Sequence, residues 1–511
     1  MSNERRRGGR SERRNQASQK IKQPPSFQPK HRFEPLRAVS DDELESIHNA
    51  SLKVLSETGI AFLDETACQQ LADAGASVDD QQVRFDPEMV MELISTAPSE
   101  FKMHGISPQR DFIMGGKWIT YTAVASPPFV TGLGHDRRDG NREDFRNLIK
   151  LTQMLNCLHT TAGYPVEPTD IHASVRHLYA THDAVTLSDK PPFVYSLGRQ
   201  RNIDGMEITR IARGVDQNTF NSEPSIFSVI NASTPLRYDT VMLHGIQEMS
   251  ARNQVICITP FTLAGAMAPI TVAGALVLQN AEALAGIAYT QLVNPGAPVI
   301  YGGFTSNVDM QSGAPAFGTP EYWKACLIGG QLARRYGFPY RSSNVNASNS
   351  VDAQSMYESV ISIWGAIMGG VNLLLHGAGW LEGGLLASYE KMVIDADVLN
   401  MVNSMLEPIT VDDATLAVEA IAEVGPGGHF FGTEHTQERF KTEHFRPMVS
   451  DWRNYESWNE SGRVEAHQRA EKIAKKLIES HEEPPMDTNI RYELDEYLEK
   501  RVAEGGVPTD Y

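Results

Sequence analysis

Short β-type runs alternate with amphipathic helical stretches from about residue 129 onward. The apolar, β-branched runs predict strands at 129–131, 158–161, 193–196, 226–230, 255–259, 299–301, 340–343 and 372–375. Helical periodicity predicts helices at 142–155, 169–187, 203–213, 238–251, 271–293, 319–336, 352–368 and 386–404. Eight strands, each followed by a helix, favour an α/β fold of the (β/α)₈ TIM-barrel type. A doubly wound open sheet is the alternative.

The pattern changes at both ends of this region. Residues 1–35 lack apolar periodicity and predict a disordered basic tail, and residues 36–128 predict an N-terminal helical segment with a hairpin near 117–121. The barrel is predicted to span residues 129–404. Residues 405–511 are rich in Glu, His and aromatic residues and predict a C-terminal cap on the barrel, followed by a polar tail.

Charge and composition exclude several classes of protein. The 511 residues carry a net charge of −18, and residues 1–32 hold ten Lys/Arg against two Glu, a local +8 that leaves −26 for the remainder. Such an acidic body is a poor partner for nucleic acid. No uninterrupted apolar run reaches the length of a membrane span, and the longest candidate, 270–293, predicts a buried helix. Four scattered cysteines suit a cytoplasmic protein.

The active site of a TIM barrel lies at the carboxyl ends of its strands. Aromatic residues follow these ends: Tyr164, Tyr195, Phe261, Tyr301, Phe304 and Trp380. Aromatic faces bind cations, including quaternary ammonium groups, although packing between barrel layers is the alternative interpretation. The sequence also lacks the residue patterns of several other enzyme classes. No carboxylate pair suits glycoside hydrolysis, no HxH or HExxH indicates a protein-bound metal, and no GxGxxG or GxxxxGK[ST] follows a strand.

Two further residues are candidates for a direct role. His376 ends the eighth predicted strand, where a catalytic or ligating residue is common, and a satisfied core histidine is the alternative. Asn346 belongs to an unusually polar run, 344–350, after the seventh strand. This run is also compatible with a set of Asx-turns and a helix N-cap.

Several long strings resemble the trimethylamine methyltransferase family of corrinoid-dependent methyltransferases. They are GPGGHFFGTEHT (425–436), VDAQSMYE (351–358), NLLLHGAGWLEGG (372–384), SYEKMVIDAD (388–397) and GAPVIYGG (296–303). The resemblance extends over about residues 36–480. It implies a TIM barrel and transfer of a methyl group from a methylated amine to the cobalt of a cobalamin-type corrinoid on a separate, cognate protein, with no metal bound by the chain itself.

One departure from that family changes the expected substrate. The archaeal trimethylamine enzymes carry pyrrolysine after the seventh strand, whereas residues 344–350 here are Asn, Ser, Ala and Val only. Members without pyrrolysine resemble demethylases of quaternary amines such as glycine betaine, proline betaine or carnitine. A quaternary nitrogen is already cationic, so its methyl group can be attacked without acid–base assistance. The carboxylate of a betaine would need an arginine or a set of backbone donors. Arg199 and Arg237 are the candidate arginines, and a surface salt bridge is the alternative role of each.

The resemblance therefore predicts an enzyme that demethylates a small quaternary amine, with a corrinoid protein as partner and no membrane. Two alternatives are methyl transfer to tetrahydrofolate and a quaternary-amine binding protein without turnover. A homo-oligomer is expected.

Overall fold

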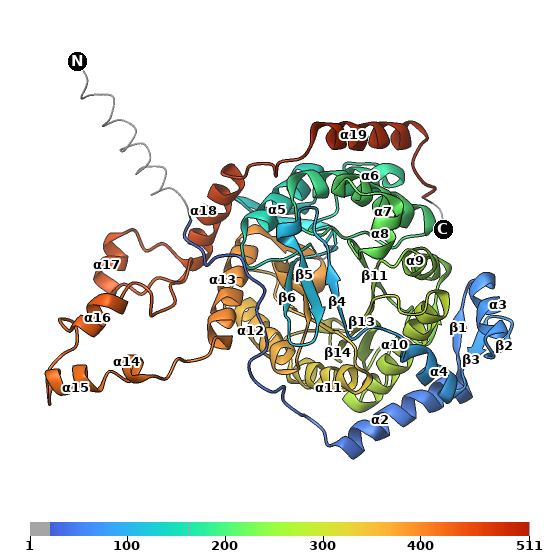
Figure 1. Ribbon diagram of the computed structural model, residues 1–511, viewed down its shortest axis with the longest axis horizontal. Helices are drawn as coiled ribbons and strands as arrows, with labels where there is room; N and C mark the ends of the chain where they lie inside the picture. Colours follow the sequence, from blue (N-terminus) through green and yellow to red (C-terminus); the bar gives the residue numbers. More distant parts are fainter. Residues whose placement is uncertain (1–20, 162, 510–511) are drawn as a thin grey trace.

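The computed structural model describes residues 21–161 and 163–509, and its elements are labelled as in Figure 1. Parallel strands pair in the order β6-β17-β16-β13-β11-β9. Two further strand positions complete the ring, because Thr160 pairs in parallel with Thr122 and Phe193 pairs in parallel with Phe227. Between the second and third strand positions, the Thr160 hydroxyl donates a 2.6 Å hydrogen bond to the Pro191 carbonyl. The pairing of the eighth strand with the first closes a TIM barrel and removes the open-sheet alternative.

The barrel strands lie close to their predicted positions, with one exception. They are β6 (Thr120–Ala123), β9 (Phe227–Ile230), β11 (Val255–Ile258), β13 (Val299–Gly302), β16 (Tyr340–Ser343) and β17 (Leu373–Ala378), with the two isolated positions between β6 and β9. The prediction of the first strand at 129–131 is wrong. That segment is β7 (Phe129–Gly132), which pairs outside the barrel with β8 (His135–Asp139) and β19 (Leu386–Ser388). The barrel therefore begins before the predicted boundary at residue 129.

Eight long helices surround the strands, as predicted (Figure 1). They are α5 (Arg142–Met154), α6 (Ala173–Leu187), α7 (Arg199–Arg213), α9 (Thr240–Ala251), α10 (Val272–Val293), α11 (Pro320–Tyr336), α12 (Ala353–Met368) and α13 (Tyr389–Leu406). Sequence signals fix their ends. Thr319 caps α11 through the Tyr322 N–H, Pro320 occupies the first turn, and Gly337 ends the helix at φ 77°.

Helix α10 is long and apolar enough to cross a membrane by length and composition, but most of it is buried inside the protein. Its hydrophobic residues face all round, which is typical of a helix enclosed by other elements. The predicted buried helix at 270–293 is therefore observed.

A hairpin of β4 (Glu100–Met103) and β5 (Phe112–Gly115) closes the end of the barrel at which the strands begin. Met103, Phe112 and Met114 from this hairpin join inward-facing side chains of the strands in one apolar cluster. Members of that cluster from the strands are Phe227, Val255, Cys257, Ile300, Leu373 and Leu375. The barrel centre is thus a packed core with room left for only about 10 Å³ among these side chains.

The N-terminal segment differs in part from its prediction. Residues 1–20 of the predicted basic tail lie outside the described residues. Residues 21–35 are bound along the barrel: the Ile119 N–H donates to the Pro29 carbonyl at 2.9 Å, and the His31 N–H donates to the Lys117 carbonyl at 2.8 Å. The prediction of disorder is therefore wrong for this part, because backbone pairing with residues 117–119 replaces the missing apolar periodicity.

Small elements follow before the barrel. The helical ones are α2 (Asp41–Lys53), the π-helical turn η1 (Val54–Thr58), α3 (Glu65–Asp73), α4 (Pro87–Ile94) and the 3₁₀ turn η2 (Pro108–Arg110), and the strands are β1 (Ile60–Phe62), β2 (Ser77–Asp79) and β3 (Gln82–Arg84). β1 also pairs with β10 (Arg237–Tyr238), which follows the fourth barrel strand. α8 (Gln217–Ser222) precedes β9, at the opposite end of the barrel. The loops above the barrel contain β12 (Phe261–Ala264), β14 (Phe304–Val308), β15 (Pro315–Ala316), β18 (Trp380–Leu381) and η3 (Glu382–Gly384).

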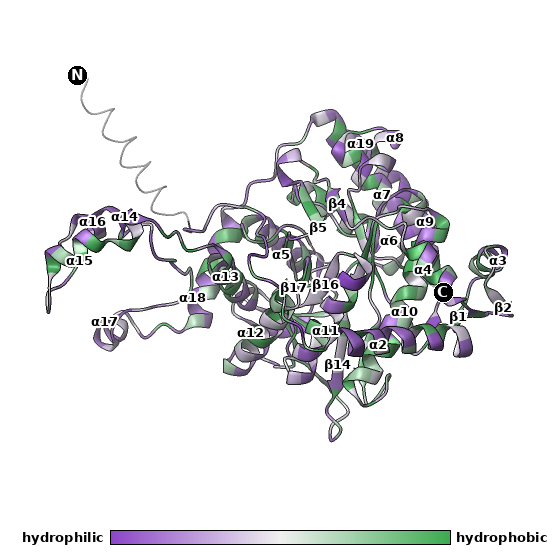
Figure 2. Ribbon diagram, turned by 60° about the horizontal axis from the view of Figure 1, so that its bottom comes forward, coloured by the Kyte–Doolittle hydropathy of each residue, from purple (hydrophilic) through white to green (hydrophobic). Residues whose placement is uncertain are grey.

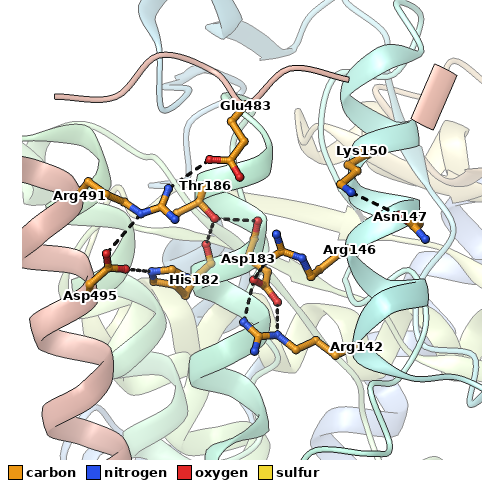
Figure 3. A network of polar contacts seen from close by, with 10 residues as sticks. All are labelled: Arg142, Arg146, Asn147, Lys150, His182, Asp183, Thr186, Glu483, Arg491 and Asp495. Atoms are coloured by element: carbon orange, nitrogen blue, oxygen red, sulfur yellow. Dashed lines mark hydrogen bonds and ion pairs between the residues drawn. The ribbon is translucent and has the colours of Figure 1, made fainter. Parts of the chain in front are cut away.

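Two C-terminal helices, α18 (Ala466–Glu479) and α19 (Thr488–Ala503), pack on the outside of the barrel helices. An ionic contact holds α19 in place (Figure 3): His182 of α6 contacts the Asp495 carboxylate of α19 at 2.8 Å. Nearby, Arg142 of α5 binds Asp183 of α6 through two hydrogen bonds of 2.7 and 3.0 Å, which join these two barrel helices. Asp204 of α7 is buried and contacts His177, Tyr497 and Arg501. Burial alone would raise the pKa of the Asp204 carboxyl, but its hydrogen bonds with His177 and Arg501 outweigh burial and hold the pKa well below its ordinary value.

Residues 407–465, here called the C-terminal arm, do not cap the barrel. The arm contains α14 (Asp413–Leu416), α15 (Val418–Val424), α16 (Glu434–Arg439) and α17 (Tyr455–Glu460). It extends sideways from α13 and α18, away from the barrel axis (Figure 1). The prediction of a cap is therefore wrong for this part, and it fits only the segment from α18 onward.

Candidate active site

A cavity of about 690 Å³ opens above the barrel core. Its wall includes Phe193, Thr259, Arg341 and His376, which lie at or near the carboxyl ends of strands three, five, seven and eight. Residues from the loops after the other strands complete the wall. The cavity therefore lies where the barrel fold places active sites, as predicted.

Three of the predicted aromatic residues, Tyr195, Phe261 and Phe304, line this cavity. The Phe261 and Phe304 rings pack together with centroids 5.0 Å apart, and Phe193 packs edge-on against Tyr195 at 5.4 Å. The cavity thus has aromatic surfaces from strands five and six on one side and from strand three on another. Such surfaces bind cationic groups through the electrons of the ring faces.

The structure does not place the other three predicted aromatics in the wall. Tyr164 lies behind Tyr195, at a centroid distance of 4.3 Å. Tyr301 faces away from the cavity, because side chains alternate along a strand and Ile300 is the residue that enters the barrel core. Its hydroxyl donates to Asn280 of α10 at 3.0 Å. Trp380 is buried behind His376.

His376 reaches the cavity from an unusual backbone position. Its φ is 53°, a left-handed conformation that costs energy for any residue other than glycine, and the strand register shifts between Leu374 and Ala378. The ring stacks on Trp380 with centroids 5.3 Å apart, and its Nδ1 has no hydrogen-bond partner. Burial and the nearby Arg341 charge lower the pKa of His376 well below its ordinary value. The imidazole is therefore neutral at neutral pH.

Asn346 is fully buried and does not line the cavity. Its amide nitrogen donates to the Trp380 carbonyl at 2.7 Å and to the Ser359 hydroxyl at 3.3 Å. It therefore connects the loop after strand seven to the loop after strand eight. This position suits a residue that holds Trp380, and through it His376, in place.

The two predicted arginines have different positions. Arg199 binds Glu248 and, at 2.7 Å, the Gln247 side chain, and it does not line the cavity. The prediction that it meets a substrate is wrong in this structure, because both partners lie on α9, outside the barrel. Arg237 is in the cavity wall, at its exposed edge on β10.

Arg341 is the cationic residue that the sequence analysis missed. It lies in β16, is 2% exposed and lines the cavity. Its Cζ is 4.8 Å from the Phe304 ring centroid, and one terminal nitrogen donates to the Gly303 carbonyl at 3.2 Å. Its Nε has no partner, and the groups that raise its pKa are thiols and phenols rather than carboxylates. Burial lowers the pKa of Arg341, yet a guanidinium stays charged in proteins.

Glu167, in the loop after the second strand position, is the acidic group of the cavity wall. Its carboxylate is 3.4 Å from Arg176, and burial raises its pKa above the ordinary value. It lies close enough to Tyr195 for its charge to raise the pKa of that phenol. The cavity therefore carries a carboxylate near Tyr195 and an uncompensated guanidinium near Phe304.

Within residues 21–161 and 163–509, no group of three or more His, Cys, Asp or Glu side chains is arranged to hold a metal ion. The four cysteines are free and buried. The chemistry of the cavity wall consists instead of aromatic rings, one neutral imidazole, small polar groups and the charges of Arg341, Arg237 and Glu167.

A closed barrel with an aromatic, charged cavity at the carboxyl ends of its strands is the architecture of a TIM-barrel enzyme. The model of the trimethylamine methyltransferase (MTTB) family matches residues 5–506. The chain belongs to this family and is a methyltransferase.

Relatives agree with this assignment. The chain is 34% identical to a glycine betaine methyltransferase of Desulfitobacterium hafniense (strain Y51), over 92% of this chain and 98% of that protein. It is 27% identical to the trimethylamine methyltransferase MttB of D. hafniense (strain DSM 10664 / DCB-2), over 92% and 95% of the two chains. A crystal structure of a hydroxylamine MtmB complex shares the fold, with a TM-score of 0.50 and 12% identity over 88% of this chain and 90% of that one.

Proposed function

We propose that this methyltransferase takes a methyl group from a carboxylated quaternary ammonium compound, of the class of glycine betaine, proline betaine or carnitine. The acceptor is the Co(I) of a cobalamin-type corrinoid on a separate protein. The observation that carries the proposal is Arg341, a buried guanidinium without a carboxylate partner in an aromatic cavity. Burying an unpaired charge is costly, so this arrangement suits a ligand that supplies the missing anion.

The positions of the charged groups indicate how such a substrate lies. Arg341 belongs to the strand itself, whereas Phe261 and Phe304 follow the ends of β11 and β13. A carboxylate bound to Arg341 therefore occupies the deeper part of the cavity. The ammonium group lies among the aromatic rings, with Glu167, which also contacts Arg176, as the acidic group of the wall, and its methyl groups face the mouth.

The residues of the wall suit a reaction that needs no proton transfer. When its carrier protein docks at the mouth, the corrinoid supplies a cobalt nucleophile that accepts the methyl group. The substrate nitrogen keeps the electron pair of the broken N–C bond and leaves as a neutral tertiary amine. A neutral His376 and aromatic walls hold the N–CH₃ bond in line and exclude water, which is where positioning contributes most to the rate.

The mouth of the cavity is compatible with such a partner. Of its lining residues, Leu197 is exposed and Ser233 and Met267 are half-buried, all three uncharged, and Arg237 adds a positive charge at the exposed edge. The absence of pyrrolysine from residues 344–350 favours a quaternary substrate over trimethylamine. The similarity to a glycine betaine methyltransferase adds support, since glycine betaine belongs to the proposed class.

The acceptor can be tested directly. The purified chain is incubated with glycine betaine, proline betaine or carnitine and with either Co(I) cobalamin or tetrahydrofolate, and methyl-cobalt absorbance and methylated folate are measured. The proposal predicts a methyl-cobalt product with at least one of the three donors and no methylated folate. Formation of methylated folate alone would contradict it, as would binding of a betaine without transfer to either acceptor.

A further inference from the structure

Helix α13 carries an ion pair that has no access to solvent. Lys391 and Asp395 lie one turn apart, both side chains are 0% exposed, and the Lys391 Nζ contacts the Asp395 carboxylate. The same Nζ donates to the Ser359 hydroxyl of α12 at 2.8 Å. Figure 2 shows α12 and α13 beside β17, the eighth barrel strand. Neither residue of the pair lines the cavity, so any effect on the reaction has to act through other residues.

The stability of the fold does not explain this pair. Burial lowers the pKa of Lys391 and raises the pKa of Asp395, so the loss of water outweighs the attraction between the two charges. Replacing a buried ion pair by apolar residues of similar volume is often neutral or stabilising. The pair therefore needs a reason other than the free energy of folding.

The Asp395 carboxylate holds the end of strand eight. Its Oδ2 accepts a 2.9 Å hydrogen bond from the Gly379 N–H, three residues after His376. Asn344 donates to the Gly377 carbonyl at 3.0 Å and also stabilises the charged form of Asp395. Buried polar side chains from outside the strand therefore fix two backbone groups that directly follow His376.

This part of the backbone turns His376 toward the inside of the barrel. Leu373 and Leu375 of β17 belong to the barrel core, so regular alternation would point His376 outward, toward the helices. The strand register instead shifts between Leu374 and Ala378, His376 adopts a φ of 53°, and its ring lines the cavity. A bulge of this kind re-aims a side chain at the cost of backbone strain, which the surrounding contacts have to hold in place.

We propose that Lys391 and Asp395 are positioning residues, which hold the end of strand eight in the conformation that aims His376 into the cavity. Asp395 supplies the acceptor for the Gly379 N–H, and Lys391 keeps that carboxylate in place through its second contact, to Ser359 of α12. The string SYEKMVIDAD, residues 388–397, contains both charged residues and thus acts on the cavity without reaching it.

The effect on the reaction rests on the proposed function. Arg341 and the rings of Phe261 and Phe304 belong to other strands and loops, so they should bind a betaine whether or not His376 is in place. The wall beside the reacting N–CH₃ bond would be displaced, and a misplacement of about 1 Å can lower a rate by about 100-fold. Loss of the positioning contact should therefore lower kcat and leave KM nearly unchanged.

Two double variants remove both charges and differ in one acceptor. Lys391→Met with Asp395→Asn keeps an amide oxygen for the Gly379 N–H, whereas Lys391→Met with Asp395→Leu does not. In crystal structures without donor or corrinoid, the asparagine variant should keep the wild-type position of His376. In the leucine variant the φ of His376 should become negative and its ring should leave the cavity wall. Chemical denaturation should show that the leucine variant folds with a stability close to that of the wild type.

Asp397→Leu is the matched control on the same helix. Asp397 is also a buried carboxylate, and it accepts hydrogen bonds from the Met448 and Val449 N–H groups at 2.7 and 3.1 Å, away from strand eight. Its removal should leave both the position of His376 and the kcat at their wild-type values. A change of His376 in this control would show that any damage to α13 has the same effect, and would overturn the assignment.

Kinetics with a betaine and Co(I) cobalamin complete the test. The kcat of the leucine variant should fall by about tenfold to 100-fold, and the asparagine variant should recover most of it. A leucine variant that keeps His376 at a φ near 53° in the cavity wall overturns the proposal. Equal losses in the two double variants also overturn it, and so does a leucine variant that fails to fold, since the pair would then serve folding. A wild type without betaine activity would contradict the proposed function instead, and the crystal structures would still decide the positioning role.

Discussion

The cavity wall and the C-terminal arm both present aromatic side chains, but in opposite settings. In the cavity, Phe261 and Phe304 pack against each other and Phe304 packs against Arg341, above a closed barrel core. In the arm, Phe431 and Trp452 face solvent with almost no supporting contacts. The difference shows that aromatic rings with a fixed scaffold and a charge suit a small ligand. Exposed rings without a scaffold suit a protein surface.

The largest effect is expected from removing the Arg341 charge from the cavity. Replacing Arg341 by Met keeps the length of the side chain and removes the guanidinium, so a bound carboxylate loses its only buried partner. Truncation of one member of a buried charge pair costs about 2–5 kcal/mol, which corresponds to roughly 30-fold to several-thousand-fold. We expect the kcat/KM for a betaine to fall by that factor in steady-state methyl-transfer assays.

A matched donor separates this effect from misfolding. Choline is a quaternary ammonium compound without a carboxylate, so whatever activity the wild type has with it should change little in Arg341→Met. Arg341→Lys should recover part of the betaine activity. Equal losses with both donors would show that Arg341 does not recognise the carboxylate.

A smaller effect is expected from Trp380, which stacks on His376 and packs against Phe317 at a centroid distance of 5.3 Å. Trp380→Ala leaves a cavity behind the imidazole and should lower the free energy of unfolding by about 3–5 kcal/mol. Betaine turnover should fall about tenfold at temperatures where the variant is folded, because His376 loses its support. Chemical denaturation and methyl-transfer assays measure the two effects, and Trp380→Phe should restore most of both. Normal turnover in a destabilised Trp380→Ala would show that the position of His376 is unimportant.

Much of the fold was predictable because its signals are local and repeated. The eight barrel helices follow from apolar periodicity and from caps such as Thr319 and Gly337. The first strand was misplaced because β6 lies where the hairpin near 117–121 was predicted, whereas the hairpin is formed by β4 and β5. Only long-range pairing with β17 or β19 distinguishes β6 from β7. The orientation of the arm was not predictable, since a sequence rich in aromatic residues does not show what covers them.

The candidate site was predictable only in part. Strand-end position indicated Phe261, Phe304 and His376, and the structure places all three in the cavity wall. Arg341 was missed because it lies inside a strand rather than after one. The alternation with Tyr340, whose hydroxyl bonds outward to the Cys326 carbonyl of α11, is the signal that places Arg341 on the inner face. Arg199 was wrongly included because its partner Glu248 is distant in sequence.

Glu167 should give betaine binding a modest dependence on pH. Burial raises the pKa of this carboxyl above its ordinary value of about 4.3, so protonation on acidification begins at a higher pH than for an exposed glutamate. The protonated form no longer attracts an ammonium group, and the Kd of a betaine should therefore rise as the pH falls through that raised pKa. Calorimetric titrations across the acidic range measure this dependence.

The variant Glu167→Gln is the control for that assignment. It should bind a betaine a few-fold more weakly at neutral pH and lose the acidic dependence. His376 does not interfere, since its pKa lies well below the ordinary value for histidine. A dependence that survives in Glu167→Gln would assign the titration to another group.

The smallest effect is expected from Arg199. Its guanidinium is 46% exposed and bound to Glu248 on α9, outside the cavity. Exposed ion pairs contribute about 0–1 kcal/mol, so Arg199→Ala should change the midpoint of thermal unfolding only slightly. Its kcat/KM for a betaine should equal that of the wild type within about twofold. A loss comparable to that of Arg341→Met would mean that Arg199 reaches the substrate in solution.

The most direct test of the proposed function compares donors in one assay. Wild-type protein is mixed with Co(I) cobalamin and equal concentrations of either a betaine or trimethylamine, and the initial rate of methyl-cobalt formation is recorded. We expect transfer from at least one betaine and almost none from trimethylamine, which lacks the carboxylate that Arg341 binds and whose N–H would lie unpaired against aromatic faces, at a cost of about 1–3 kcal/mol. Trimethylamine reacting as fast as every betaine would contradict the assignment of a carboxylated quaternary substrate.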